Sequence, residues 1–212
     1  MDITENDTGR RLDATEDYAV VQELGDCYAS VGNYMEAHKC YEKAAGLEPD
    51  EPGPYVGLGV VALQKNLLED AEIAFRVACR LDANCSKAWS GLAMVAQQRG
   101  DYKQAFEMYL KCLELDVDNL IALLGLFQTS CQMGSFAKVI HYLQLYLKMH
   151  PGDTSVMFPL AALYMKDNKL KQSKKILSEI LTLDPENKDA ANLLEEVEHG
   201  LAKAQQKGIK IG

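Results

Sequence analysis

The sequence has 212 residues, of which 48% are hydrophobic and 25% are charged, and its net charge at neutral pH is −9. These proportions are ordinary for a globular protein with a buried core, and no run of about 20 apolar residues is present that could cross a membrane. The negative charge argues against a nucleic-acid-binding protein, because phosphate recognition depends on lysine and arginine. The first residues contain no apolar stretch typical of a signal peptide, so we expect a cytoplasmic protein.

The acidic residues are concentrated in the first part of the chain. Residues 1–85 contain 17 Asp and Glu against 7 Lys and Arg, whereas residues 86–212 contain 14 against 15. A group of lysines near the C-terminal end forms a candidate basic patch, at Lys166, Lys169, Lys171, Lys174 and Lys175. Such an asymmetry can steer a basic partner or favour head-to-tail contact, although a charged face is more often simply solvated.

The cysteines and histidines argue against a metal site and against catalysis. The six cysteines, at positions 27, 40, 79, 85, 112 and 131, form no C-x-x-C motif and do not combine with the four histidines at metal-site spacing. We therefore expect no metal, and reduced thiols rather than disulfides. The histidines lack a carboxylate or cysteine partner in a catalytic pattern, so we expect neither enzyme activity nor a cofactor.

Residues 1–14 are polar and are predicted to form a disordered arm. The chain then repeats with a period of about 34 residues. Shifting the sequence by one period aligns a series of leucines, Leu24, Leu58, Leu92, Leu126 and Leu160. The same shift aligns Gly57 with Gly91, Gly125 and Pro159. A period of this length with helical spacing inside it predicts an all-α fold of antiparallel helix pairs that bury their apolar stripes by stacking.

The repeat divides the chain into consecutive predicted units. Five repeats are expected within residues 15–187, at 18–51, 52–85, 86–119, 120–153 and 154–187. A single helix over residues 188–206 is predicted to cap the stack with a polar face that includes Glu195, Glu196 and Glu198. Residues 207–212 are predicted to be a flexible tail.

The first repeat resembles the tetratricopeptide repeat (TPR) at eight positions, Val21, Leu24, Gly25, Tyr28, Ala37, Tyr41, Ala44 and Pro49. Later repeats follow the pattern less strictly, with Trp89 in the aromatic position of the third and Pro151 and Pro185 closing the fourth and fifth. The resemblance implies a right-handed α-solenoid, with the first helix of each repeat lining an inner surface where ligands bind. It also implies a non-catalytic scaffold for protein binding.

One short stretch permits a different interpretation. Residues Gly57–Ala62 match the pattern G-x-G-x-x-A, which in dinucleotide-binding folds follows a strand and opens a helix. Here Pro52 and Pro54 precede the motif, and its leucine keeps the register of the other repeats. A phosphate-binding turn has no reason to recur once per period, so the repeat interpretation is favoured.

The inner wall is predicted from positions offset from the inward-packing leucines and tyrosines. The predicted partner-binding residues are Gln22, Asp26, Val56, Gly57, Val60, Gln64, Ser90, Gly91, Met94, Gln98, Leu124, Gly125, Gln128, Gln132, Phe158 and Ala162. One hypothesis is that the three glycines open a furrow for a partner's backbone; the alternative is that glycine is only a common filler there. Pro159 is expected to bend its helix and widen the C-terminal end.

The predicted partner is a protein or peptide segment with apolar and basic character, because the wall changes from acidic residues in repeat one to apolar residues further on. The lysine and arginine clamp that some relatives use for acidic C-termini is not expected, since only Lys87 has a suitable charge. Two alternatives to an adaptor stay open. One is self-assembly through the tail, with Ile209 and Ile211 docking in a neighbouring groove; the other is a chaperone for an exported apolar substrate.

Overall fold

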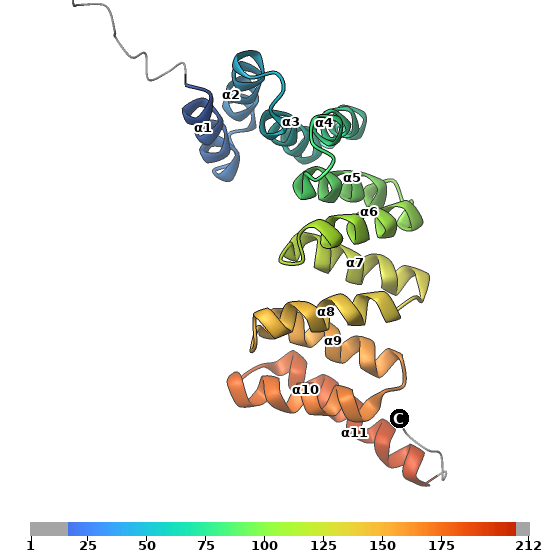
Figure 1. Cartoon of the computed structure of the whole chain (residues 1–212). Coiled ribbons are helices and arrows are strands. Elements are labelled where there is room, and N and C mark those ends of the chain that lie inside the picture. Colours follow the sequence, from blue (N-terminus) through green and yellow to red (C-terminus); the bar gives the residue numbers. More distant parts are fainter. Residues whose placement is uncertain (1–16, 207–212) are drawn as a thin grey trace, which may run out of the picture. The chain divides into compact units, whose positions relative to one another are not determined.

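The structure is a computed structural model that describes residues 17–206, so the predicted arm of residues 1–14 and the predicted tail of residues 207–212 lie outside it. Between residues 17 and 206 the chain forms eleven α-helices and no strand (Figure 1). Their bounds are α1 Tyr18–Ser30, α2 Tyr34–Leu47, α3 Pro52–Gln64, α4 Leu68–Leu81, α5 Ser86–Gln98, α6 Tyr102–Leu115, α7 Leu120–Met133, α8 Ala137–Met149, α9 Thr154–Lys166, α10 Leu170–Leu183 and α11 Lys188–Gln206. None of these helices is both long and apolar enough to span a bilayer.

The chain divides into two compact units, Met1–Val95 and Ala96–Gly212, with the boundary inside α5. In unit 1, α1 packs on α2 and α3, and α3 packs on α4. In unit 2, each helix from α6 to α11 packs on the next one in the sequence (Figure 1). Odd-numbered helices are the first helices of the pairs and even-numbered helices are the second helices, and these names are kept below.

The turn inside each helix pair contains one residue in the left-handed backbone conformation. It contains a residue with positive φ at Gly32, Asn66, Gly100, Gly134 and Asn168, which recur once per repeat. Glycine and asparagine are the residues that tolerate this left-handed conformation best. These glycine and asparagine residues therefore recur with the sequence period because the chain reverses direction at each of them, between a first helix and its second helix.

Capping of the second helices differs from pair to pair. Asn33 accepts a hydrogen bond from the backbone N–H of Glu36, and Asp101 accepts one from Gln104. Leu67 occupies the equivalent position before α4 and has a similar backbone conformation, but its side chain cannot cap the helix. An uncapped helix start is less stable by about 1 kcal/mol.

The C-terminal helix α11 closes unit 2 by burying an apolar stripe. Ala190 and Val197 are fully buried in a cluster that includes Leu177 and Ile180 of α10. The predicted outer residues Glu195, Glu196 and Glu198 are exposed. Lys174 of α10 pairs with Glu198 at 2.7 Å. The end of unit 2 is thus apolar toward α10 and polar toward water.

Helix α9 continues from Thr154 to Lys166 with Pro159 inside it, and Pro159 is buried. Asp153, just before the helix, caps it by accepting a hydrogen bond from the backbone N–H of Ser155. The chain therefore accommodates a proline within a continuous helix, and the bend expected there stays a prediction.

Candidate functional site

Aromatic rings of the second helices occupy the space beside the three glycines of the predicted inner wall. A Cβ atom built on Gly57 would have three ring atoms of Tyr41 within 2.6 Å, and Gly91 has the same relationship to Phe75. In unit 2, Gly125 is packed in this way against Tyr109. The hypothesis of an open furrow at these glycines is therefore wrong, because each missing side chain is replaced by a ring from the same unit.

In unit 1 each ring lies between two successive first helices. The ring of Tyr41 also approaches Gly25 of α1, where a Cβ atom would be 2.8 Å from its Cε1 atom. The ring of Phe75 likewise approaches Gly59 of α3 as well as Gly91 of α5. Glycine is required at these positions because the backbones of the first helices come close to the rings. The alternative that glycine is only a common filler does not explain these positions either. A side chain is absent there because a ring of the neighbouring second helix occupies its place.

Ser90 is a second correction to the predicted wall. It is only 5% exposed, so it belongs to the core beside Gly91 and not to an open surface. Ser90 was predicted to line the wall because the prediction used only its position along α5. The burial of α5 by neighbouring helices is not visible in that position. Four of the predicted contact residues, Gly57, Gly91, Gly125 and Ser90, are therefore inaccessible.

Two polar residues predicted in repeat one are held by contacts within unit 1. The Tyr41 hydroxyl donates a hydrogen bond to Oδ1 of Asp26 at 2.6 Å, and burial together with this bond raises the pKa of the Tyr41 phenol. Gln22 accepts a hydrogen bond from the Tyr18 hydroxyl, and its amide lies against Gly53 of α3. Asp26 stays exposed and Gln22 is half-buried, so both orient the helices as well as facing solvent.

The apolar part of the wall in unit 1 stays accessible on α3. Val60 is 38% exposed and Val56, one turn earlier, is partly exposed. Gln64 follows one further turn along the same side and is exposed. Met94 of α5 is also partly exposed. These residues leave a short apolar strip that packing within the described part of unit 1 does not cover.

In unit 2 the predicted wall includes a hydrogen-bonded polar group on α7 as well as apolar residues. Gln128 of α7 accepts a hydrogen bond at 2.8 Å from Gln97, which in turn accepts one from the Tyr109 hydroxyl. The sequence analysis did not include Gln97 in the wall, because the repeat aligns its neighbour Gln98 with Gln64 and Gln132. Among the other predicted residues of unit 2, Gln98 and Gln132 are exposed, and three are partly buried, Leu124, Phe158 and Ala162.

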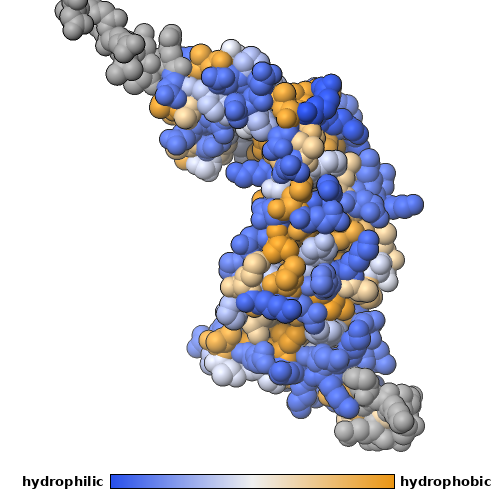
Figure 2. Space-filling view, viewed as in Figure 1, coloured by the Kyte–Doolittle hydropathy of each residue, from blue (hydrophilic) through white to orange (hydrophobic). Residues whose placement is uncertain are grey.

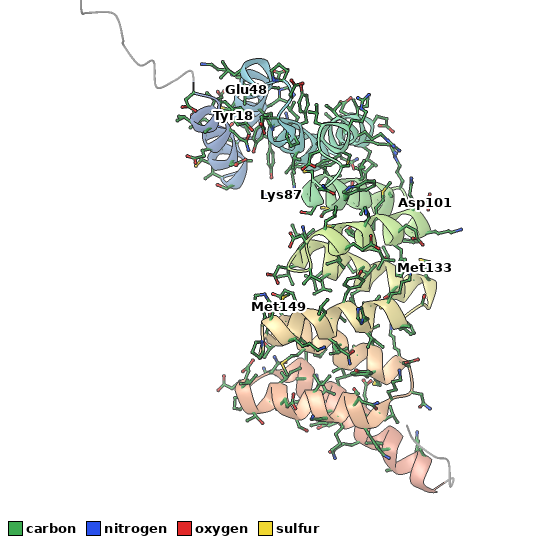
Figure 3. The ribbon with its side chains drawn as sticks, viewed as in Figure 1. Tyr18, Glu48, Lys87, Asp101, Met133 and Met149 are labelled. Atoms are coloured by element: carbon green, nitrogen blue, oxygen red, sulfur yellow. The ribbon has the colours of Figure 1, made fainter. Side chains whose placement is uncertain are left out.

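The start of unit 1 carries a concentration of negative charge. Residues 17–51 contain 8 Asp and Glu against 2 Lys and Arg. Tyr18 and Glu48 lie near each other in Figure 3. The pKa of Tyr18 is raised by burial and then by the carboxylates of Glu51, Glu48 and Asp26. A partner of this region would meet a negative potential.

The predicted lysine patch is largely neutralised by local pairs. Lys169 pairs with Asp167 at 2.8 Å, and Lys174 pairs with Glu198 at 2.7 Å. Lys175 lies 3.9 Å from Glu179. These exposed pairs contribute little to stability, but they reduce the positive potential that the sequence pattern indicated.

Two clefts occur at equivalent positions on the second-helix side. The cleft in unit 1, of about 360 Å³, lies between α2, α3 and α4, and the cleft in unit 2, of about 460 Å³, lies between α8, α9 and α10. Their linings correspond after a shift of three repeat periods: Tyr55 with Met157, Leu58 with Leu160 and Ala74 with Ile176. Sequence reasoning missed these outer clefts because it considered only the first helices.

The wall of the outer cleft in unit 1 contains two unusually exposed apolar residues. Ile73 is 63% exposed and Leu67 is 48% exposed. Leu67 is also the residue that leaves α4 without a side-chain cap. A leucine in a position that favours Asn or Asp could have signalled this cleft in the sequence.

Comparisons with known proteins agree with the repeat architecture. Residues 7–107 match the family model of the middle TPR-like domain of cilia and flagella-associated protein 70, and residues 132–197 match a tetratricopeptide repeat model. Together with the stacked helix pairs, these matches define the class: an all-α helical repeat solenoid. The chain is a tetratricopeptide repeat protein.

Individual relatives are distant. The chain is 24% identical over 168 residues to the TPR repeat-containing protein YpiA of Bacillus subtilis, covering 79% of this chain and 40% of that protein. The chain thus spans less than half the length of this curated relative. A solved structure of Pseudomonas aeruginosa pilF has a TM-score of 0.72 at 19% identity, covering 90% of this chain and 88% of that one. The structure of YrrB, described as a TPR protein with an unusual peptide-binding site, has a TM-score of 0.63 at 18% identity, with coverages of 84% and 92%.

Proposed function

We propose that this protein is a non-catalytic adaptor that binds an apolar segment of another protein along its first helices. The observation that carries the proposal is the open strip of Val56 and Val60 on α3, beside Gly57, which the ring of Tyr41 fills. Apolar side chains left uncovered on a repeat protein are typical of a binding surface. In unit 2, the first helices contribute the partly exposed Leu124 of α7 and Phe158 of α9.

Polar residues at the edge of this strip fit a peptide ligand. The side-chain amide of Gln64 has no hydrogen-bond partner among residues 17–206, so it is available to a ligand main chain. The acidic residues of α1 would favour a ligand with positive charge at that end. The similarity to YrrB, whose structure is described as having a peptide-binding site, supports a peptide or protein partner but not its sequence.

The proposal is tested by quantitative affinity capture with three variants of the full chain. Val60→Glu and Leu124→Glu place a charge on the first-helix side of unit 1 and unit 2, respectively. Ile73→Glu is the matched control, since Ile73 is an exposed apolar residue of the outer cleft. Thermal unfolding of each variant, followed by circular dichroism, checks that the helices remain intact.

A partner on the first-helix side is expected to be lost from Val60→Glu, from Leu124→Glu or from both, and retained by Ile73→Glu. The reverse pattern would assign binding to the outer cleft and contradict the proposal. The self-assembly alternative depends on residues 207–212, outside the described residues. It predicts that the wild-type chain is larger than a monomer in light scattering.

A further inference from the structure

Helix α1 carries an apolar stripe that is exposed, although the same stripe is covered in the other first helices. Val20 is 48% exposed, Leu24 is 46% exposed, and Cys27 is exposed as well. These residues are spaced by four and three positions, so they lie on one side of the helix. Figure 2 shows apolar patches among polar side chains over α1.

The repeat gives five internal comparisons for this stripe. The positions equivalent to Val20 and Cys27 are buried in each of α3, α5, α7, α9 and α11. In α9, for example, Val156, Leu160 and Leu163 are 0%, 3% and 0% exposed. The position equivalent to Leu24 is buried or partly buried in all five helices. The expectation that Leu24 packs inward like the other leucines is therefore wrong for α1.

In four of these five helices, the preceding second helix covers the stripe. Helix α2 packs on α3, α6 on α7, α8 on α9 and α10 on α11. No second helix precedes α1 among the described residues. The exposed stripe of α1 therefore has the shape of a repeat interface that lacks its second helix.

One residue distinguishes this interface from those of α3, α5 and α7. The position that receives the aromatic ring is Gly57 in α3, Gly91 in α5 and Gly125 in α7, but it is Glu23 in α1. A ring cannot approach the backbone there, because a Cβ atom already conflicts with it at the three glycines. Glu23 is exposed and has no hydrogen-bond or ion-pair partner within residues 17–206.

We propose that the α1 stripe, formed by Val20, Leu24 and Cys27, binds an amphipathic helix of a different protein. This helix packs as a second helix does, but it carries lysine or arginine where α2, α4 and α6 carry an aromatic ring, so that its charge meets Glu23. The excess of Asp and Glu in unit 1 complements such a basic helix. A second copy of this chain fits poorly, because its own α1 would bring the same acidic residues to the interface.

The test uses two helix-stapled peptides with the α2 sequence Tyr34–Leu47, since an unconstrained helix of this length is marginal in water. One probe keeps the tyrosine and the other carries Tyr41→Arg. Their binding to the full chain is measured by fluorescence anisotropy. The arginine probe is expected to bind about tenfold more tightly than the tyrosine probe.

Variants of the full chain separate the charge effect from the apolar contact. Glu23→Gly is expected to reverse the preference, because it creates the glycine that accepts a ring. Leu24→Glu is expected to weaken binding of both probes by about tenfold or more, since it places a charge in the apolar stripe. Ile73→Glu, in the outer cleft of unit 1, is the control and is expected to leave both affinities unchanged.

Three results would overturn the proposal. They are equal affinity of the wild-type chain for the two probes, binding that Leu24→Glu does not weaken, and absence of binding by either probe. A wild-type dimer in sedimentation equilibrium that Leu24→Glu converts to a monomer would also overturn it, by identifying a second copy as the occupant. None of these results bears on the Val56 and Val60 strip, so failure here is distinct from failure of the adaptor proposal.

Discussion

The phenol ring of Tyr109 lies against the backbone of Gly125, at the point where the side chain of any other residue would begin. Both residues are buried, so neither can move aside into solvent. The same relationship joins Tyr41 to Gly57 and Phe75 to Gly91 in unit 1. Ring and glycine therefore form a matched pair in which the size of one residue determines the size allowed at the other.

Replacement of Gly125 by alanine is expected to destabilise the protein by about 1–3 kcal/mol, because the added methyl group overpacks a site that Tyr109 already fills. Urea unfolding measures the loss. In a Tyr109→Leu background the same Gly125→Ala change should cost much less, since the ring is absent, and the difference is the coupling energy of the pair.

Gly46→Ala is the control. Gly46 has open space around it, so the change should be neutral or stabilising by up to about 1 kcal/mol. Equal costs of Gly125→Ala in both backgrounds would contradict the pairing.

Leu67→Asn is expected to stabilise the protein by about 1 kcal/mol, because it supplies the side-chain cap that α4 lacks. The backbone at Leu67, with φ −90° and ψ 74°, is close to that of the capping residue Asn33, at −82° and 67°. Differential thermal unfolding of the variant and the wild type gives the sign. The reciprocal change Asn33→Leu should lower stability by a similar amount. A destabilising Leu67→Asn would indicate that the apolar contacts of Leu67 in the outer cleft outweigh the cap.

Asp153 makes the stability of unit 2 sensitive to acid. The hydroxyl of Ser155 and then that of Tyr146 donate hydrogen bonds to its carboxylate and hold its pKa below the usual value of 3.8, against the opposing effect of burial. Because the folded-state pKa is lower than the unfolded-state value, the ionised carboxylate stabilises the folded state. This contribution is complete above the unfolded-state pKa and is lost as the pH falls through the folded-state pKa.

The measurement is the free energy of unfolding in urea at a series of pH values from 6 downward, starting about two units above the usual aspartate pKa. Asp153→Asn keeps an oxygen that can accept from the backbone N–H of Ser155 but removes the titration, so its stability should fall less steeply in acid than that of the wild type. Ser155→Ala, which removes one donor, should give an intermediate slope. Identical slopes for all three proteins would exclude a role of Asp153.

Attachment of α11 depends on apolar burial more than on its ion pair with α10. Val197 is fully buried, and Val197→Ala is expected to cost roughly 2 kcal/mol. Lys174 and Glu198 are about half exposed, so Lys174→Ala should cost less than about 1 kcal/mol. Hydrogen exchange of the α11 amides measures both effects at the helix itself. Faster exchange in Lys174→Ala than in Val197→Ala would reverse this order.

The sequence was sufficient for the family and for the all-α solenoid, because a regular period leaves the same trace in every repeat. The turn residues are an example: Gly32, Asn66, Gly100, Gly134 and Asn168 are spaced by one period because each has positive φ. Such features depend on local backbone conformation, so they can be predicted from the sequence without knowing which helices pack together.

The predicted wall was less accurate, because accessibility depends on what a neighbouring helix contributes. Gly57 and Val60 lie on the same helix one turn apart, yet a ring from α2 covers the first and leaves the second 38% exposed. Leu24 has the same place in the repeat as Leu160, but within residues 17–206 a preceding second helix packs on the helix of Leu160 and none precedes that of Leu24. Helical periodicity determines the direction of a side chain, whereas burial requires the partner to be known.

Each ring is matched to a residue sixteen positions further along the chain, at 41 and 57, 75 and 91, and 109 and 125. Insertion of one residue between the two members would rotate the following helix by about 100° and bring a side chain to the ring in place of the glycine. Insertion or loss of a whole repeat leaves every remaining pair intact. The length of this protein can therefore change in evolution by entire repeats far more readily than by single residues.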